Sequence, residues 1–190
     1  MEKRIKEATR YLGYKSKVID EQTCNMLVEG FSKLEGIAHS RFVYRLFLIN
    51  HLGDDKLKIG EMKIHSKNLA RNLQGCERCA IFAVTLGTEV DMYIRRYAIT
   101  DMAKALIMQA CAAVLVEEQC DKIEAELRCQ GTLKARFSPG YGDLSLEYQK
   151  DILKVLDATK KIGVTINDEY MMLPLKSVTA FVGIRKDNND

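Results

Sequence analysis

Three long apolar runs of alternating pattern constrain the fold of this chain more than any other feature. They lie at 42–49, 79–86 and 177–184, and each is rich in β-branched and aromatic residues. Such runs are typical of β-strands. In the first run both sets of alternate positions are apolar apart from Arg45. The sequence therefore predicts three long strands, and we expect the first to be covered on both faces.

Helices are predicted between these strands. Asp101 to Leu127 forms a long helix whose first half is apolar almost all round, so we expect that half to be central. Ser66 to Leu73 is a short capped helix, and Ser145 to Ile162 is an amphipathic helix that Gly163 can end. A further helix follows the second strand, where Thr88 can serve as its N-cap.

The order of the elements decides the fold class. Strands and helices do not alternate in a strict βαβ rhythm, which favours an α+β fold over a doubly wound one. We expect a mainly antiparallel twisted sheet flanked by helices. The 190 residues suit one domain over 1–190, with room for two closely packed lobes. Within it we expect an N-terminal arm at 1–15, a ligand loop at 128–144 and a frayed tail at 186–190.

Charge and composition exclude several classes of partner. Lys and Arg number 29 and Asp and Glu 26, so the net charge of +3 is too small to indicate nucleic acid or an anionic membrane. The longest apolar stretch, 102–116, contains Lys104 and Gln109 and is shorter than the ~20 residues of a membrane span. The first six residues are charged and unlike a signal peptide. We therefore expect a cytoplasmic protein with reduced thiols.

Other residues that could bind a metal or take part in catalysis do not form a complete site. Cys76 and Cys79 have the spacing of half a zinc site or of a redox pair, but no second pair of ligands accompanies them. We interpret both as packed thiols and expect no metal. His39, His51 and His65 lie in no nucleophile motif, and no Gly-x-Gly-x-Gly loop follows the first strand. No catalytic residue is predicted.

The clearest binding chemistry lies in a turn rich in Gly and Pro after the long helix. Segment 131–143 contains Pro139, which Gly140 and Tyr141 follow. Such a turn can bring backbone N–H and C=O groups close to a flat ligand. Arg136 offers a planar fork of donors for a carboxylate or phosphate, and Tyr141 offers a ring face and a hydroxyl. The spacing alone is equally compatible with an ordinary loop that has a surface Arg and a packed Tyr.

The series of motifs in the last third of the chain resembles a known family. Arg136-Phe-Ser-Pro-Gly-Tyr141 is followed by the predicted helix, then by Ile162-Gly-Val-Thr165, Met171-Met172, Pro174 and Ser177-Val178. This order resembles the C-terminal activation domain of cobalamin-dependent methionine synthase. That family carries Arg-x-x-x-Gly-Tyr, a helix, a Gly-containing turn, a Met and Pro, and Ser-Val-Ser.

The resemblance implies an S-adenosylmethionine-binding module that reactivates methionine synthase after its cobalamin has oxidised. One electron from a flavodoxin-like donor and one methyl group from S-adenosylmethionine would restore methylcobalamin. No Asp-x-His-x-x-Gly motif occurs in this chain. Cobalamin is therefore expected only through a partner, a cobalamin-binding methionine synthase subunit.

The resemblance also implies which residues bind the ligand. It assigns the ligand's carboxylate to Arg136. The loop contacts fall to Ser138, Pro139, Gly140 and Tyr141. Glu117 matches a family Glu near the ligand, where a carboxylate would suit the α-ammonium group, although a shift of one position would bring Glu118 there.

One departure from the family leaves the function open. Longer members continue into an aromatic pair that contacts the ligand, whereas this chain ends with Gly183-Ile-Arg-Lys-Asp-Asn-Asn-Asp190. A non-catalytic module that senses S-adenosylmethionine or docks onto a corrinoid protein is the alternative to a reactivation subunit. Reactivation of another corrinoid methyltransferase is a third possibility.

Overall fold

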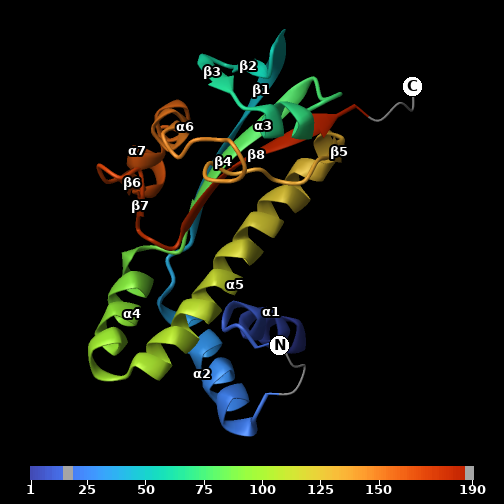
Figure 1. The fold of residues 1–190 in the computed structure, drawn as a ribbon. Helices are drawn as coiled ribbons and strands as arrows, with labels where there is room; N and C mark the ends of the chain where they lie inside the picture. The colour runs from blue at the N-terminus through green and yellow to red at the C-terminus, as the bar shows by residue number, and fades with distance from the viewer. Residues whose placement is uncertain (15–18, 187–190) are drawn as a thin grey trace.

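The fold, seen in a computed structural model that describes residues 1–14 and 19–186, is built on an antiparallel sheet with helices on both faces (Figure 1). The sheet has six strands in the order β3-β2-β1-β4-β8-β5, and β6 and β7 form a separate pair. The strands are β1 (Arg41–Gly53), β2 (Lys56–Ile59), β3 (Met62–His65), β4 (Arg78–Thr85), β5 (Thr132–Leu133), β6 (Thr165–Ile166), β7 (Met172–Leu173) and β8 (Ser177–Arg185). The predicted α+β class and the three long strands are confirmed.

The helices are distributed between two layers. They are α1 (Glu2–Tyr11), α2 (Glu21–Ile37), α3 (Lys67–Asn72), α4 (Thr88–Thr100), α5 (Met102–Leu127), the short 3₁₀ helix η1 (Arg128–Gln130), α6 (Tyr148–Leu156) and α7 (Ala158–Ile162). In Figure 1, α5 runs from the helices α1, α2 and α4 up to the sheet. No helix in the described part of the chain is long and apolar enough to cross a membrane.

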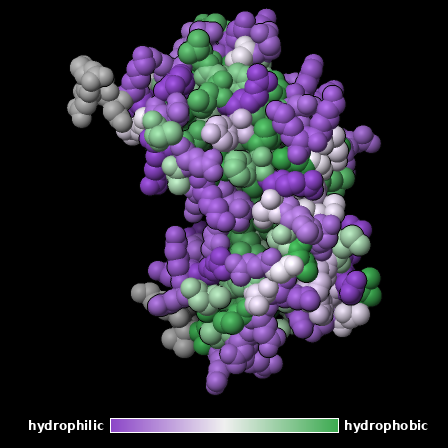
Figure 2. Space-filling model, turned by 180° about the vertical axis from the view of Figure 1, so that it is seen from behind, coloured by the Kyte–Doolittle hydropathy of each residue, from purple (hydrophilic) through white to green (hydrophobic). Residues whose placement is uncertain are grey.

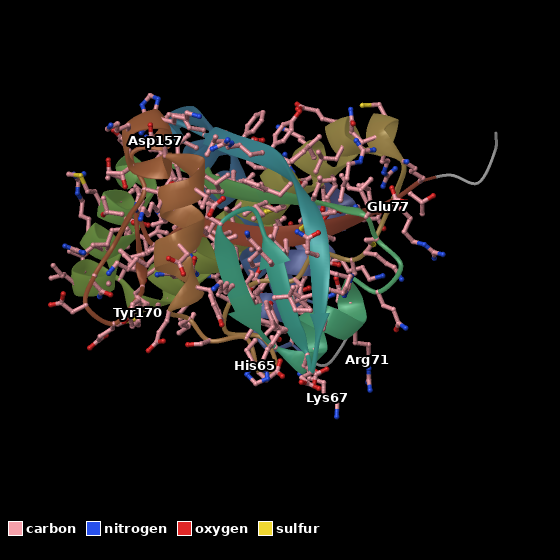
Figure 3. All side chains as sticks on the ribbon, turned by 90° about the horizontal axis from the view of Figure 1, so that it is seen from above. His65, Lys67, Arg71, Glu77, Asp157 and Tyr170 are labelled. Atoms are coloured by element: carbon pink, nitrogen blue, oxygen red, sulfur yellow. The ribbon has the colours of Figure 1, made fainter. Side chains whose placement is uncertain are left out.

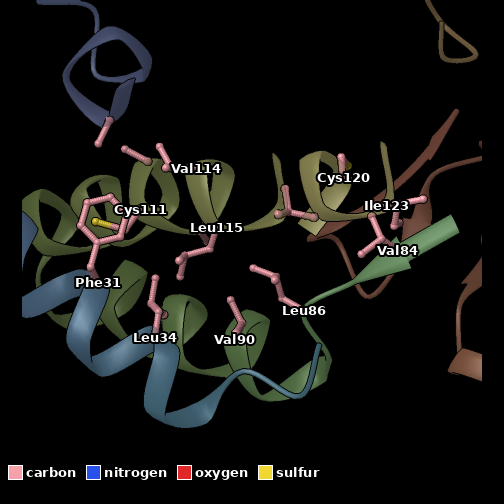
Figure 4. Packing of buried hydrophobic residues seen from close by; sticks show 14 of the residues in the cluster. Phe31, Leu34, Val84, Leu86, Val90, Cys111, Val114, Leu115, Cys120 and Ile123 are labelled. Atoms are coloured by element: carbon pink, nitrogen blue, oxygen red, sulfur yellow. The ribbon is translucent and has the colours of Figure 1, made fainter. Parts of the chain in front are cut away.

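The first half of α5 is central, as its apolar sequence predicts. Asp101 caps the helix by accepting a hydrogen bond from the Lys104 amide at 3.0 Å. Figure 4 shows how α2 packs against it, with Phe31 pointing toward Cys111. Leu115 lies in the same buried cluster. This core joins α2, α4 and α5 to one face of β4 and β8.

A second core lies on the other face of the sheet. Phe181 of β8 and Ile81 of β4 pack there with Ile152 and Leu156 of α6, and all four are fully buried. The two central strands β4 and β8 are therefore covered on both faces. This double cover explains why 79–84 in β4 and 180–184 in β8 contain only apolar residues and one glycine.

The predicted helix from Ser145 to Ile162 is wrong as a single element. The chain forms α6 and α7, and Asp157 between them adopts a left-handed conformation with φ of 54°. Asp tolerates this conformation better than most residues, so the chain changes direction there. Gly163 ends α7 with φ of 73°, as the sequence predicts.

The expected cover on both faces of β1 is also wrong. Helices α6 and α7 pack on the face that carries Val43 and Phe47. On the opposite face Phe42, Tyr44 and Leu46 are 44, 37 and 38% exposed. Helix α5 crosses β4 and β8 instead, so its cover stops short of β1.

Further differences concern local elements. Residues 1–15, expected as an arm, contain α1, which packs on α5. The N-cap of α4 is Gly87, and Thr88 is its first helical residue, so Thr88 is not the cap. Ser66 does cap α3, accepting from the Leu69 amide at 3.1 Å. Of the predicted tail, 187–190 lie outside the described residues.

Candidate functional site

The segment that carries Arg136 is fixed along the sheet edge. After η1 the chain turns at Gly131, whose φ is +134° and where a Cβ atom would meet the carbonyl oxygen of Arg185. Strand β5 then pairs with the end of β8. Phe137 and Phe181 exchange two backbone hydrogen bonds of 2.8 and 2.9 Å. Arg136 is thus held beside β8, within reach of α5.

The turn that follows is closed by its own backbone. The Gly140 amide donates to the Leu144 carbonyl at 2.8 Å, and the Leu144 amide donates to the Tyr141 carbonyl at 3.0 Å. Gly140 has a φ of +91°, which a residue with a side chain adopts only with strain. The turn leaves the Tyr141 side chain 66% exposed. Its exposed ring is free to contact a ligand.

Asp143 attaches this turn to α3. Its carboxylate accepts hydrogen bonds from the Ser66 hydroxyl at 2.5 Å and from the amides of Lys67 and Asn68 at 2.7 and 3.2 Å. The Ser66 hydroxyl and the two amides hold the pKa of the Asp143 carboxyl below its usual value. Figure 3 shows the labelled Lys67 at the outer end of the molecule, beside the β2–β3 hairpin.

Replacing Asp143 with asparagine should therefore change how stability depends on pH. A carboxyl whose pKa is lower in the folded state stabilises the fold above its unfolded pKa, and this contribution is lost as pH falls through the folded value. We expect the thermal midpoint of the wild type to exceed that of Asp143→Asn at pH 7, with the difference shrinking toward pH 3. Circular dichroism melts at several pH values measure this. An unchanged difference across that range would contradict the assigned role.

The guanidinium of Arg136 is held by three carboxylates of α5. Its Nη2 donates to Oε2 of Glu117 and to Oδ1 of Asp121, and its Nη1 donates to Oε1 of Glu124. All three distances are 2.9 Å. The acidic residues are spaced by four and three positions, which places them on one face of the helix. We call these four residues the Arg136 cluster.

The Arg136 cluster has a strongly negative balance. Burial alone would lower the pKa of Arg136, but its hydrogen bond to Asp121 and the negative charges of Glu124 and Glu117 outweigh burial and raise the pKa. One guanidinium against three carboxylates leaves a formal charge of −2. Such a site favours a ligand with more positive than negative groups.

Glu117 and Glu118 contact different arginines. Glu118 points toward α1, where both of its oxygens accept from Arg4 at 2.7 and 2.8 Å. Arg4 also pairs with Glu35 at 2.8 Å. Only Glu117 lies beside Arg136, with its side chain 39% exposed.

A cavity of about 350 Å³ opens next to the Arg136 cluster. We call it the Arg136 cavity. Of the residues that the resemblance points to, its lining includes Glu117, Arg136, Ser138, Pro139 and Tyr141. Its volume lies within the range of about 300–1,000 Å³ typical of small-molecule sites. Gly140 is not part of the lining and shapes the turn behind it.

Part of the Arg136 cavity was not foreseen in the sequence. Gln149 and Thr179 line it and are buried, and the Thr179 hydroxyl donates to the Gln149 amide oxygen at 2.6 Å. Ser177 and Met172 line it as well. The signal was the pair of hydroxyl residues at alternate positions of an otherwise apolar strand, since these need polar partners when buried.

Four of the six cysteines are buried. Burial raises the pKa of Cys76 and Cys79, and raises that of Cys111 and Cys120 to about 12. Thiolate formation by these four residues is therefore disfavoured at neutral pH. Within residues 1–14 and 19–186, no three His, Cys, Asp or Glu side chains are placed to hold a metal ion.

Comparison with known proteins gives two findings. A family model described as "Vitamin B12 dependent methionine synthase, activation domain" matches residues 66–189, well over half of the chain. Among solved structures, the "Crystal Structure of the MetH Reactivation Domain bound to AdoHcy" aligns with a TM-score of 0.71 and 17% identity. That alignment covers 100% of this chain and 77% of the other. No curated protein matches the sequence.

Proposed function

Because the chain belongs to the family of vitamin B12 dependent methionine synthase activation domains, we propose that it binds S-adenosylmethionine in the Arg136 cavity and reactivates a separate methionine synthase. The fold is that of a reactivation domain, and the similar solved domain is bound to AdoHcy. The partners in this proposal are a cobalamin-binding methionine synthase subunit and a flavodoxin-like electron donor. Both are carried over from the family.

The charge of the Arg136 cluster is the observation that best supports this ligand. S-adenosylmethionine carries an ammonium group, a sulfonium group and one carboxylate, so it is positive overall. The formal charge of −2 on the cluster complements such a ligand. Glu117 both lines the cavity and belongs to the cluster, so it is placed to attract the ammonium group.

Arg136 retains donors for the ligand's carboxylate. A guanidinium has five N–H groups, and three of them are used in the cluster. The Nε–H and one Nη1–H remain. They point in different directions, so each can donate a single hydrogen bond to a ligand carboxylate. The carboxylates of α5 meanwhile fix the guanidinium plane, so little side-chain freedom is lost when a ligand binds.

In the reaction, the chain binds S-adenosylmethionine, orients its methyl group and shields it from water. The bound sulfonium supplies the methyl group that restores the partner's cofactor after one-electron reduction. Tyr141 presents an exposed ring at the cavity mouth, and Phe137 and Pro139 provide apolar walls that exclude water. No residue of this chain is required as a general acid or base.

Isothermal titration with S-adenosylmethionine tests the proposed site. We expect binding that weakens as salt is raised, since charge drives it. S-adenosylhomocysteine, whose sulfur is neutral, should bind about tenfold more weakly. Absence of binding at millimolar ligand would refute the assignment of the cavity.

Reactivation of methionine synthase needs a second measurement, because titration reports only ligand binding. The protein, S-adenosylmethionine and a chemical reductant are mixed with a methionine synthase whose cobalamin is oxidised, and the corrinoid spectrum is followed. A reactivation subunit produces the methylcobalamin spectrum. A chain that only senses the ligand or docks leaves the spectrum unchanged while it still binds in the titration.

A further inference from the structure

Strand β1 has an open edge along its first half. It pairs with β4 over 41–48, whereas β2 pairs with it only from Ile49 onward. The Ile49 amide bonds to the Glu77 carbonyl of the β4 side at 2.9 Å, so the odd-numbered residues of β1 face β4. The N–H and C=O groups of Phe42, Tyr44 and Leu46 therefore face outward. No hydrogen bond to them occurs within 1–14 and 19–186.

The same residues expose large apolar side chains. Phe42, Tyr44, Leu46 and Leu48 alternate along one face and are 44, 37, 38 and 69% exposed. We call them the β1 stripe. In Figure 3 the first half of β1 lies outside β4, with no strand beyond it. Figure 2, seen from behind, shows hydrophobic patches among hydrophilic groups in the half that holds the sheet.

The usual protections of an edge strand are missing here. Soluble proteins normally place lysine, proline or a covering element at an exposed edge. The β1 stripe contains no charge and no proline. Arg45 lies on the opposite face, where it donates to the Val155 carbonyl at 2.8 Å and stacks on Phe47 at 5.4 Å. An edge of this kind is suited to pairing with another strand.

We propose that the open edge of β1 pairs with the same edge of a second copy of this chain, antiparallel about a two-fold axis at Tyr44. Two identical edges related by such an axis are self-complementary, because each outward N–H meets an outward C=O. This register pairs 41–47 with its copy and ends before the segment that β2 occupies from Ile49 onward.

Side-chain contacts favour this register. Phe42 lies opposite Leu46 of the second copy, an aromatic–aliphatic pair that stabilises neighbouring strands. Arg45 lies opposite Val43 of the second copy. An axis at Arg45 would instead place two guanidinium groups opposite each other, which is destabilising. Electrostatics therefore selects the axis at Tyr44.

The size of the exposed surface on β1 sets the expected affinity of the dimer. Four partly exposed side chains and one strand edge fall short of the roughly 800 Å² per partner of a standard interface. We therefore expect a reversible dimer that forms with rising concentration, with a dissociation constant on the order of 10 μM. Sedimentation equilibrium of the full chain from about 1 to 200 μM measures the average mass, which should rise toward twice that of the monomer.

A charge placed on the two-fold axis gives a sharp test. Tyr44→Lys brings two lysines opposite each other, and Tyr44→Glu brings two glutamates opposite each other, so each variant alone should stay monomeric. An equal mixture of the two should recover the dimer, because lysine then faces glutamate. Ile99→Lys is the control, since Ile99 is 84% exposed on α4, and it should dimerise like the wild type.

Each result bears on the proposal. Circular dichroism first establishes that the variants are folded. A wild type that is monomeric up to 200 μM overturns self-pairing, and so does a dimer that survives in both Tyr44 variants. Monomeric variants whose mixture stays monomeric overturn the axis at Tyr44. S-adenosylmethionine binding is independent of all these outcomes.

Discussion

Replacing Arg136 with alanine is expected to reduce S-adenosylmethionine affinity by about 10- to 100-fold, the effect of losing one or two charged hydrogen bonds. The guanidinium provides the remaining donors for the ligand's carboxylate, and it also orders Glu117 beside the cavity. Removing it leaves three carboxylates of α5 facing one another. The isothermal titration proposed for the wild type measures the loss of affinity directly.

The same change should also lower the free energy of unfolding. Arg136 is 26% exposed and holds Glu117, Asp121 and Glu124, which would otherwise repel one another. Because solvent screens part of this repulsion, we expect a loss of about 1–2 kcal/mol. Urea denaturation measures it.

The chain offers a matched control where α1 packs on α5. Arg4 is also 26% exposed and also holds two carboxylates, those of Glu118 and Glu35. Arg4→Ala should destabilise the fold to a similar degree but leave S-adenosylmethionine affinity within about twofold of the wild type. Equal losses of affinity in both variants would mean that Arg136 acts on the ligand only through stability.

The long strands could be predicted because the local sequence pattern determines where they form. Which of their faces helices cover could not be predicted. Alternation identified 42–49 as a strand with two apolar faces. Which face is covered depends on where α5 crosses the sheet, and a periodicity of two residues carries no information on that. The β2–β3 hairpin was missed because its strands have four residues each, and the break at Asp157 because it depends on one left-handed residue.

The sequence pointed to a segment that lines a cavity, but not to the side chains that hold Arg136 there. The turn around Pro139 and the family's order of motifs led to the lining of the Arg136 cavity. The partners of Arg136 were missed, although Glu117, Asp121 and Glu124 form an acidic stripe at helical spacing. A stripe of this kind is usually a solvated face, and only the packing of segment 131–143 against α5 shows that it holds a guanidinium.

Replacing Phe181 with alanine should give the largest loss of stability among these changes, about 3–5 kcal/mol. Phe181 is fully buried in the core between β8 and α6, so the substitution leaves a cavity there. Its backbone also holds Phe137, which lines the Arg136 cavity. A typical domain is stable by only about 5–15 kcal/mol, so much of this reserve would be lost.

Two further variants separate the cavity effect from the loss of an aromatic ring. Phe181→Leu fills most of the space and should cost less than half as much as Phe181→Ala. Phe42→Ala removes the same side chain from the exposed face of β1 and should cost below about 1 kcal/mol, measured at low micromolar protein where the chain is monomeric. Urea denaturation ranks the three variants by their loss of free energy of unfolding. A loss in Phe42→Ala as large as in Phe181→Ala would contradict the placement of the core on β4 and β8.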